Sequence, residues 1–288
     1  MRVERVLASA PGGHLTACDP TEAPLIVADS WLVTDGQVRA IDKHRRRFFG
    51  ACIDEAAVPI DQLWTFWQEV LAELPREGTW FPRVELCADS SAALRLRIRP
   101  APPLAAEVQV WVADVPDPRI APHRKGPDLG VLAKVRERAA QWGAQEALLT
   151  TRSGVVLEAA NSSVLWWEGN DLCAPSATLP TLAGVTAGLI LDRAQQIGLK
   201  IVFRRGTAAQ LDGREVWLVN ALHGIRPVTG WPGSSLSPGT AVRARQWQTW
   251  LAGLAVPLPT IPPSSASSVS EVKGGQKRMT QVDVIAGL

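Results

Sequence analysis

Residues 125–186 constrain the fold of this 288-residue chain more than any other stretch. Val131, Val135 and Ala139 place apolar side chains on one face of a helix. From residue 146 onward the pattern changes to short apolar runs that are separated by turns containing Gly. A helix that leads into several short strands predicts a mixed fold of the α/β (α+β) class.

Two charged residues of this stretch, Lys125 and Glu158, are candidates for a functional site. Lys125 follows a proline-containing linker and lies next to Arg124, a position that by itself is typical of a surface lysine. Glu158 ends the apolar run 155–157. A buried carboxylate is costly unless it is paired, so Glu158 either has a partner inside the protein or faces water.

The segment 182–186 reads Leu-Ala-Gly-Val-Thr and leads into a helical pattern that Gly198 ends. Backbone N–H groups at the start of a helix attract anions. The backbone N–H groups of Val185 and Thr186, together with the hydroxyl of Thr186, are predicted to bind an anion such as phosphate.

The N-terminal part of the chain contains a hairpin signal and a basic run. Asp35-Gly36 lies between two β-rich segments and predicts a hairpin. Asp42 is a candidate N-cap for the next helix, which carries the basic run 43–47. Such a run is typical of a solvated face and sometimes of a nucleic-acid patch. Here Phe48 and Phe49 fix the helix against a core, so the arginines do not all share one free face.

A second group of arginines alternates with apolar residues. Arg95, Arg97 and Arg99 are interleaved with Leu94, Leu96 and Ile98, which predicts a half-buried strand with a basic outer face. That face either lies in solvent, or one of its arginines turns into a site and binds a substrate carboxylate.

Composition and motifs exclude several classes of protein. A net charge of +2 does not demand a nucleic-acid partner, and no apolar run approaches the roughly 20 residues of a membrane span. The N-terminus lacks the apolar core of a signal peptide, and four widely spaced cysteines are typical of a reducing compartment. We therefore expect a cytoplasmic protein without a metal site, a nucleic-acid partner or a membrane partner.

Proline-rich connections divide the chain. Prolines at 100, 102 and 103 interrupt the first sheet, and those at 116 and 118 begin a connection to the second half. A Pro- and Ser-rich stretch follows Pro257. These breaks predict an N-terminal domain over 1–118, a C-terminal domain over 119–258 and a flexible tail over 259–288.

Taken together, the motifs resemble class IV aminotransferases, the fold type IV pyridoxal phosphate (PLP) enzymes. They follow one another in the order of that family: the hairpin, His44 with Arg47, Lys125 before its helix, the strand ending at Glu158, the Val185-Thr186 loop, and the turn at Asn220-Ala221. The resemblance implies a smaller N-terminal α/β domain and a larger C-terminal domain with a β-barrel-like sheet. It also implies a homodimer that binds PLP and a small-molecule amino substrate.

The resemblance assigns a role to each matched residue. Lys125 would be the lysine that forms a Schiff base with PLP, and burial together with Arg124 would lower its pKa. Glu158 would bond the pyridine nitrogen and keep it protonated. The cofactor phosphate would be bound by the remaining matched residues: Arg47, Val185, Thr186, Asn220 and Ala221.

Three functions stay open at this point. The chain could be a PLP-dependent lyase similar to aminodeoxychorismate lyase, which gives 4-aminobenzoate and pyruvate for folate synthesis. It could instead be a branched-chain or D-amino-acid aminotransferase that transfers an amino group to a 2-oxo acid. Departures from the family pattern at Asp29-Ser30, Ser163 and Ala187 allow a third possibility, a non-catalytic descendant.

Overall fold

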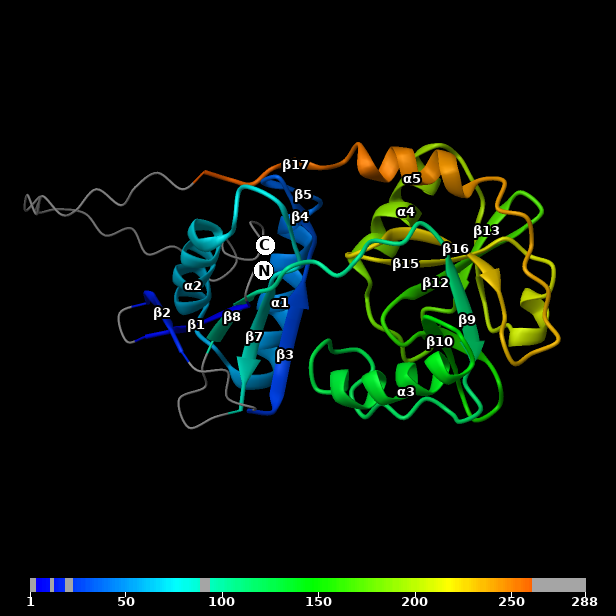
Figure 1. Ribbon diagram of the computed structural model, residues 1–288, viewed down its shortest axis with the longest axis horizontal. Coiled ribbons are helices and arrows are strands. Elements are labelled where there is room, and N and C mark those ends of the chain that lie inside the picture. Colours follow the sequence, from blue (N-terminus) through cyan, green and yellow to red (C-terminus); the bar gives the residue numbers. More distant parts are fainter. Residues whose placement is uncertain (1–3, 11–12, 19–22, 89–93, 261–288) are drawn as a thin grey trace, which may run out of the picture.

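The computed structural model describes residues 4–10, 13–18, 23–88 and 94–260, and its strands form two groups that carry separate helices (Figure 1). The strands are β1 (Arg5–Ser9), β2 (Leu15–Ala17), β3 (Leu25–Ser30), β4 (Val33–Thr34), β5 (Gln37–Val38), β6 (Thr79–Trp80), β7 (Arg83–Cys87), β8 (Leu94–Ile98), β9 (Val108–Val112), β10 (Glu146–Thr150), β11 (Val156–Ala159), β12 (Ser163–Glu168), β13 (Asp171–Pro175), β14 (Ile201–Arg204), β15 (Val216–Asn220), β16 (Gly224–Gly230) and β17 (Val256–Pro257). The helices are α1 (Ile41–Ala56), α2 (Ile60–Glu73), α3 (Leu129–Gln141), α4 (Val185–Gln196), α5 (Ala244–Ala252) and a short 3₁₀ turn, η1 (Ala208–Leu211).

The N-terminal group is a five-stranded sheet, β2-β1-β8-β7-β3, with α1 and α2 packed on one face. Leu63, Phe66 and Val70 repeat along α2 at helical spacing and are fully buried against the sheet. The strands contribute alternate residues to this core, such as Val84 and Leu86. The intervening side chains therefore lie on the face of the sheet that the helices leave open.

Helix α1 begins differently from the prediction. Its N-terminal cap position is Ala40, with φ 48°, and no side chain caps the helix. Asp42, expected as the cap, lies in the first turn instead. There its carboxylate still favours the helix, because negative charge stabilises a helix N-terminus.

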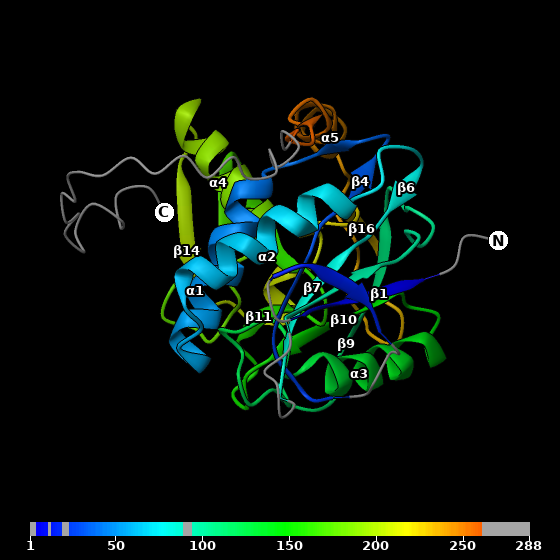
Figure 2. The same cartoon turned by 90° about the vertical axis from the view of Figure 1, so that its left-hand side faces the viewer.

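The C-terminal group is an eight-stranded sheet, β11-β10-β9-β16-β15-β12-β13-β14. It curls around an inner apolar cluster that includes Val110, Leu148, Trp166 and Leu218. Helix α3 packs on β9 and β10, whereas α4 and α5 pack on the strands from β16 to β13. All three helices lie outside the inner cluster, and because the sheet curls, Figures 1 and 2 show α3 on one side of the barrel-like sheet and α4 and α5 on the other. The predicted α/β (α+β) class with a barrel-like sheet is confirmed.

The chain crosses between the two groups twice. After β8 it runs to β9, which pairs with β10 and β16 in the second sheet. Near its end, β17 returns and pairs with β5 in the small sheet β17-β5-β4-β6 (Figure 1). The strand at 108–112, which the sequence placed in a domain ending at 118, thus belongs to the sheet of the second group. The domain division at 118 stays a prediction, and most of the predicted tail, residues 261–288, lies outside the described residues.

Within the described residues, none of the helices combines the length and the apolar character needed to span a membrane.

Candidate active site

Asp29 on β3 is a buried carboxylate that holds two side chains of α1. Its Oδ1 lies 2.8 Å from His44 Nδ1 and 2.9 Å from Arg47 Nη2, and its Oδ2 lies 2.8 Å from Arg47 Nε. Burial alone would raise the pKa of Asp29, but Arg47 and then His44 hold it well below its usual range. The two side chains are therefore fixed to the edge strand of the first sheet.

Arg47 extends from this anchor toward the second group of strands. Its Nη1 donates a hydrogen bond of 2.9 Å to the carbonyl of Ala183, directly before α4. Burial by itself would lower the pKa of the Arg47 guanidinium, but the charge and hydrogen bonds of the Asp29 carboxylate have the larger effect, so the pKa is raised. A permanently charged fork, suited to phosphate oxygens, thus lies beside the loop that opens α4.

Lys125 is positioned by a backbone contact with the same strand. Its carbonyl accepts a hydrogen bond of 2.7 Å from Ala28 N. Gly126, at φ +140°, follows it, and a Cβ there would lie 2.9 Å from that same nitrogen. Only glycine allows so close an approach of the two backbones. The connection at Lys125 is therefore docked on β3, next to Asp29.

The surroundings of Lys125 favour a neutral amine. Burial, followed by the positive charge of Arg47, lowers the pKa of Lys125 to about 8. Asp29 and Glu158 act in the opposite direction, and the charge of Arg83 adds to the lowering. Arg124, the cationic neighbour expected from the sequence, forms an ion pair with Glu55 instead and is not among the main causes of this pKa shift.

Glu158 on β11 is buried and paired. Its Oε1 accepts hydrogen bonds from Arg119 Nη1 and, at 3.0 Å, from the backbone N–H of Leu182. Burial raises the pKa of Glu158, and Arg119 opposes that shift. Its second oxygen, Oε2, has no hydrogen-bond partner among the described residues. Of the two possibilities left by the sequence, a partner inside the protein is the one observed.

The first turn of α4 offers free donors. Gly184 is its cap residue, and no side chain caps the helix, so the N–H groups that follow need another partner. Val185 and Thr186 are buried there. Ser163 lies directly beneath, because a Cβ on Gly184 would come within 2.4 Å of Ser163 Oγ. The predicted anion site is thus a helix N-terminus whose loop is held close to the sheet.

A small pocket brings together three predicted residues from distant elements. Val185, Thr186 and Ala221 line it, and His44 lines it as well. Asn220 is turned away: its Nδ2 donates to Ser162 Oγ at 3.0 Å, and its Oδ1 accepts from His223 N at 2.8 Å. The Asn220 side chain therefore shapes the turn, which leaves Ala221 as the pocket residue of this pair.

Sequence reasoning missed three residues of the site. Asp29 left one signal, since it is an acid within the apolar run 25–33. Arg119 left none, because its partner Glu158 is 39 positions away. Arg39 also lines the pocket, where its Nη2 lies 3.5 Å from the Ala221 carbonyl. Burial lowers the pKa of Arg39, which has no carboxylate partner among the described residues.

Known proteins resemble this chain in sequence and in fold. A sequence model of the family described as Amino-transferase class IV matches residues 27–231. Over 85 residues the chain is 34% identical to the aminodeoxychorismate lyase of Bacillus subtilis (strain 168), and that match covers 29% of this chain and 29% of the enzyme.

Solved structures of aminotransferases share the fold, as two examples show. The branched-chain aminotransferase of Thermoproteus uzoniensis superposes with a TM-score of 0.71 at 15% identity, covering 88% of this chain and 99% of that one. A hypothetical aminotransferase from Mycobacterium tuberculosis, in its PLP-bound form, superposes with a TM-score of 0.68 at 19% identity, and the superposition covers 88% of this chain and 98% of that one.

Proposed function

Because the chain belongs to the class IV aminotransferase family of PLP enzymes, we propose that it is a PLP-dependent lyase similar to aminodeoxychorismate lyase. Its products would be 4-aminobenzoate and pyruvate. The observation that carries the proposal is the position of Lys125, whose pKa is lowered to about 8 and whose amine experiences the charges of Arg47, Asp29 and Glu158. A lysine that attacks an aldehyde must be partly neutral at physiological pH, and this one is.

The residues present fit PLP. The phosphate would bind Arg47, the first-turn N–H groups of α4 at Val185 and Thr186, and the backbone at Ala221. We add Arg39 to this set, because it is a half-buried cation that lines the same pocket and has no carboxylate partner among the described residues. It would supply positive charge near the phosphate, whereas position 187, basic in many family members, is alanine here.

The other end of the cofactor would meet Glu158. Its Oε2 would accept the N–H of the pyridine ring, while Arg119 holds Oε1 and keeps the carboxylate in place. When bound, PLP supplies an electron sink next to the substrate amine. A negative charge at Glu158 strengthens that sink, because it keeps the ring nitrogen protonated.

Lys125 would then act as the proton carrier. With substrate bound, the amine of Lys125 would remove the proton from the ring carbon that bears the substrate nitrogen. The enolpyruvyl group leaves as the ring becomes aromatic, and Lys125 can return the proton to the departing fragment. An amine with a pKa near 8 suits both directions of transfer.

The open face of the first sheet supports an anionic substrate. Arg83 Nε and Arg97 Nε share the buried Glu85 carboxylate at 2.6 and 2.7 Å. Arg99 has no carboxylate partner among the residues described, and burial, followed by Arg83, lowers its pKa to about 10. Such a face suits a substrate with carboxylates better than one with a branched apolar side chain.

The same face also supports the alternative, a class IV aminotransferase, because a dicarboxylic 2-oxo acid would satisfy the same arginines. An acceptor requirement separates the two functions. Lyase activity releases 4-aminobenzoate without any 2-oxo acid, whereas an aminotransferase produces nothing beyond one turnover without an acceptor. Members of the family are dimers, and we expect a homodimer here, to be measured by light scattering.

The first experiment is an absorbance spectrum with PLP, before and after borohydride, for the wild type and for Lys125→Ala. We expect a visible band in the wild type and no such band in the variant. Borohydride should abolish the band and leave the cofactor covalently attached to the peptide that contains Lys125. Assays with aminodeoxychorismate, and with amino-acid and 2-oxo-acid pairs, then distinguish the activities. Absence of the band in the wild type would overturn both and leave a non-catalytic descendant.

A further inference from the structure

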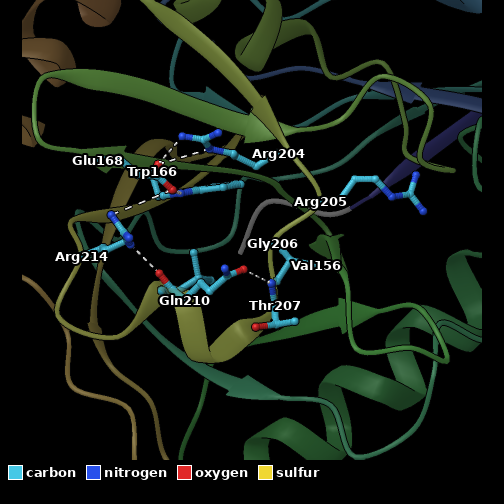
Figure 3. A pocket seen from close by; sticks show the side chains of 10 residues that line it. Val156, Trp166, Glu168, Arg204, Arg205, Gly206, Thr207, Gln210 and Arg214 are labelled. Carbon is cyan, nitrogen blue, oxygen red and sulfur yellow. Dashed lines mark hydrogen bonds and ion pairs between the residues drawn. The ribbon is translucent and has the colours of Figure 1, made fainter.

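A second cavity lies away from the candidate active site, at the end of the curled sheet. It has a volume of about 290 Å³ and shares no lining residue with the site described above. The segment after β14 and the short turn η1 form its walls, together with the apolar residues Val156 and Trp166 (Figure 3). Leu211 lines it as well. Its size suits a small molecule at the lower end of the usual range.

The polar wall of the cavity carries excess positive charge. Glu168 Oε2 accepts a hydrogen bond of 2.9 Å from Arg204 Nη2, and Glu168 Oε1 lies 4.0 Å from Arg214 Nη1. Arg205 also lines the cavity, and among the described residues its one hydrogen bond goes to the hydroxyl of Thr178, at 3.2 Å. Three guanidinium groups and one carboxylate therefore line the cavity, which gives the lining a formal charge of +2, and two of the three arginines lie beside that carboxylate.

Donor capacity remains on two of these groups and on a neighbouring amide. Arg204 uses Nε and Nη2 on Glu168, and Arg214 uses Nε on the carbonyl of Gln210. A guanidinium has five N–H donors, so several are left on each. The Oε1 of Gln210 accepts from Thr207 N at 2.9 Å, and its Nε2 has no partner within the described part of the chain. Figure 3 shows Arg204 and Arg214 on either side of Glu168, with Gln210 close by.

We propose that this cavity is a binding site for a small organic anion. A carboxylate or phosphate group would lie between Arg204 and Arg214, near the amide of Gln210, and an apolar body would lie over Trp166. The guanidinium forks would supply charge-assisted hydrogen bonds, and the apolar lining would exclude charged or strongly hydrated bodies. This inference does not depend on the reaction proposed for the PLP site.

The wall of the cavity is joined to the elements that carry the active site. Val156 N donates a hydrogen bond of 2.8 Å to Gly206 O, and Glu158 lies two residues farther along the same strand. Ser176 N donates a bond of 2.8 Å to Arg204 O, at the start of the loop that leads to α4. A bound anion would thus contact a segment that is hydrogen-bonded to both parts of the candidate active site.

Calorimetric titration of the full-length protein, after removal of unbound PLP, tests the proposal. The probes are benzoate and phenyl phosphate, which carry a ring and an anionic group, and benzyl alcohol, which lacks the charge. We expect both anions to bind, more weakly as salt rises, and the alcohol to bind at least tenfold more weakly. Preference for benzoate or for phenyl phosphate identifies the group that the site takes.

Variants separate this cavity from the active site, which also faces arginines. Arg204→Ala is expected to weaken benzoate binding about tenfold, and Glu168→Gln to strengthen it severalfold, because the competing carboxylate is gone. Arg245→Ala removes an exposed arginine on α5 and is the matched control. Benzoate affinity that is unchanged in both Arg204→Ala and Glu168→Gln would overturn the proposal. If Arg204→Ala fails to fold, Glu168→Gln alone tests the proposal: stronger benzoate binding supports it, and unchanged or weaker binding overturns it.

Discussion

At Asp29, one carboxylate holds His44 and Arg47 in place, and through Arg47 it reaches the loop before α4. Asp29 is fully buried, whereas the Arg47 side chain keeps 19% of its surface exposed. A buried charge that loses its partners is strongly destabilising. The geometry at residue scale therefore makes Asp29 both a structural residue and a positioning residue for the proposed phosphate ligand.

Asp29→Asn is expected to lower the free energy of unfolding by about 3 kcal/mol, because Arg47 and His44 lose their charged partner. It should also weaken PLP binding about tenfold, since Arg47 is no longer held toward α4. Urea unfolding and an absorbance titration with PLP measure the two effects. Asp192→Asn breaks an exposed pair with Lys43 and is the control, expected to cost less than about 1 kcal/mol. A cost for Asp29→Asn as small as that of the control would show that the pair is not coupled to folding.

The amine of Lys125 is expected to titrate near pH 8 in the protein without PLP. Its pKa is lowered from 10.5 to about 8, so the neutral, reactive form should dominate above that pH and be lost as the pH falls below it. Acylation of the protein at a series of pH values, followed by peptide mass spectrometry, gives the midpoint directly. The extent of acylation at the exposed Lys134 in the same samples corrects for changes in the reactivity of the reagent with pH.

Arg47→Gln tests the cause of this pKa shift. It removes the positive charge that, after burial, contributes most to the lowered pKa of Lys125, so the midpoint of the Lys125 titration should move to higher pH. A midpoint above pH 10 in the wild type would contradict the environment described for Lys125.

At the scale of elements, the site depends on two close backbone approaches. The connection at Lys125-Gly126 docks on β3, and the loop at Gly184 lies on Ser163 at the start of β12. Neither contact belongs to a sheet ladder or to a helix. Both place a loop against the edge or the end of a strand, where the regular element gives a rigid support for residues that bind a ligand.

Gly126→Ala is expected to disrupt the first of these contacts. At φ +140° an alanine is strained, and its Cβ would lie 2.9 Å from Ala28 N, so the connection must move away from β3. Lys125 moves with it, and we expect at least a tenfold loss of PLP affinity together with a lower melting temperature. Gly130→Ala is the matched control, because nothing lies within 4 Å of its new Cβ and it is part of α3. That variant should be neutral or slightly more stable. Equal behaviour of the two would mean that the connection is not docked tightly.

At the scale of the whole molecule, the candidate site is assembled from both groups of strands. Asp29, Arg39 and Arg47 come from the first group, Lys125 comes from the connection, and Glu158, Thr186 and Ala221 come from the second group. A ligand that touches all of them links the two groups. Its binding free energy therefore adds to the stability of the folded arrangement as a whole.

PLP is expected to stabilise the whole protein against urea. At a free concentration 100 times its dissociation constant, a ligand that binds only the folded state adds about 2.7 kcal/mol. Pyridoxal, which lacks the phosphate, should add much less at the same concentration, and Arg39→Gln or Arg47→Gln should reduce the difference between the two ligands. Unfolding curves followed by tryptophan fluorescence and by circular dichroism measure this. Equal stabilisation by PLP and pyridoxal would contradict a phosphate site at Arg39, Arg47 and α4.

The sequence by itself determined what depends on local pattern. Helical spacing identified α3, Asp35-Gly36 identified the hairpin between β4 and β5, and the pairing requirement of a buried carboxylate marked Glu158. The order of the motifs was sufficient to indicate the family, and the match over residues 27–231 confirms it. These features are readable because each depends on residues a few positions apart.

Only the tertiary structure decided which distant residues meet. Arg119 bonds Glu158 across 39 positions, Arg47 bonds Ala183 across 136, and Arg39 approaches Ala221 across 182. No local periodicity encodes such pairs, because they arise from how the two curved sheets pack and where the connection crosses. For the same reason the departure at Asp29, which looked like a loss from the family pattern, is in this fold the buried carboxylate that orients Arg47.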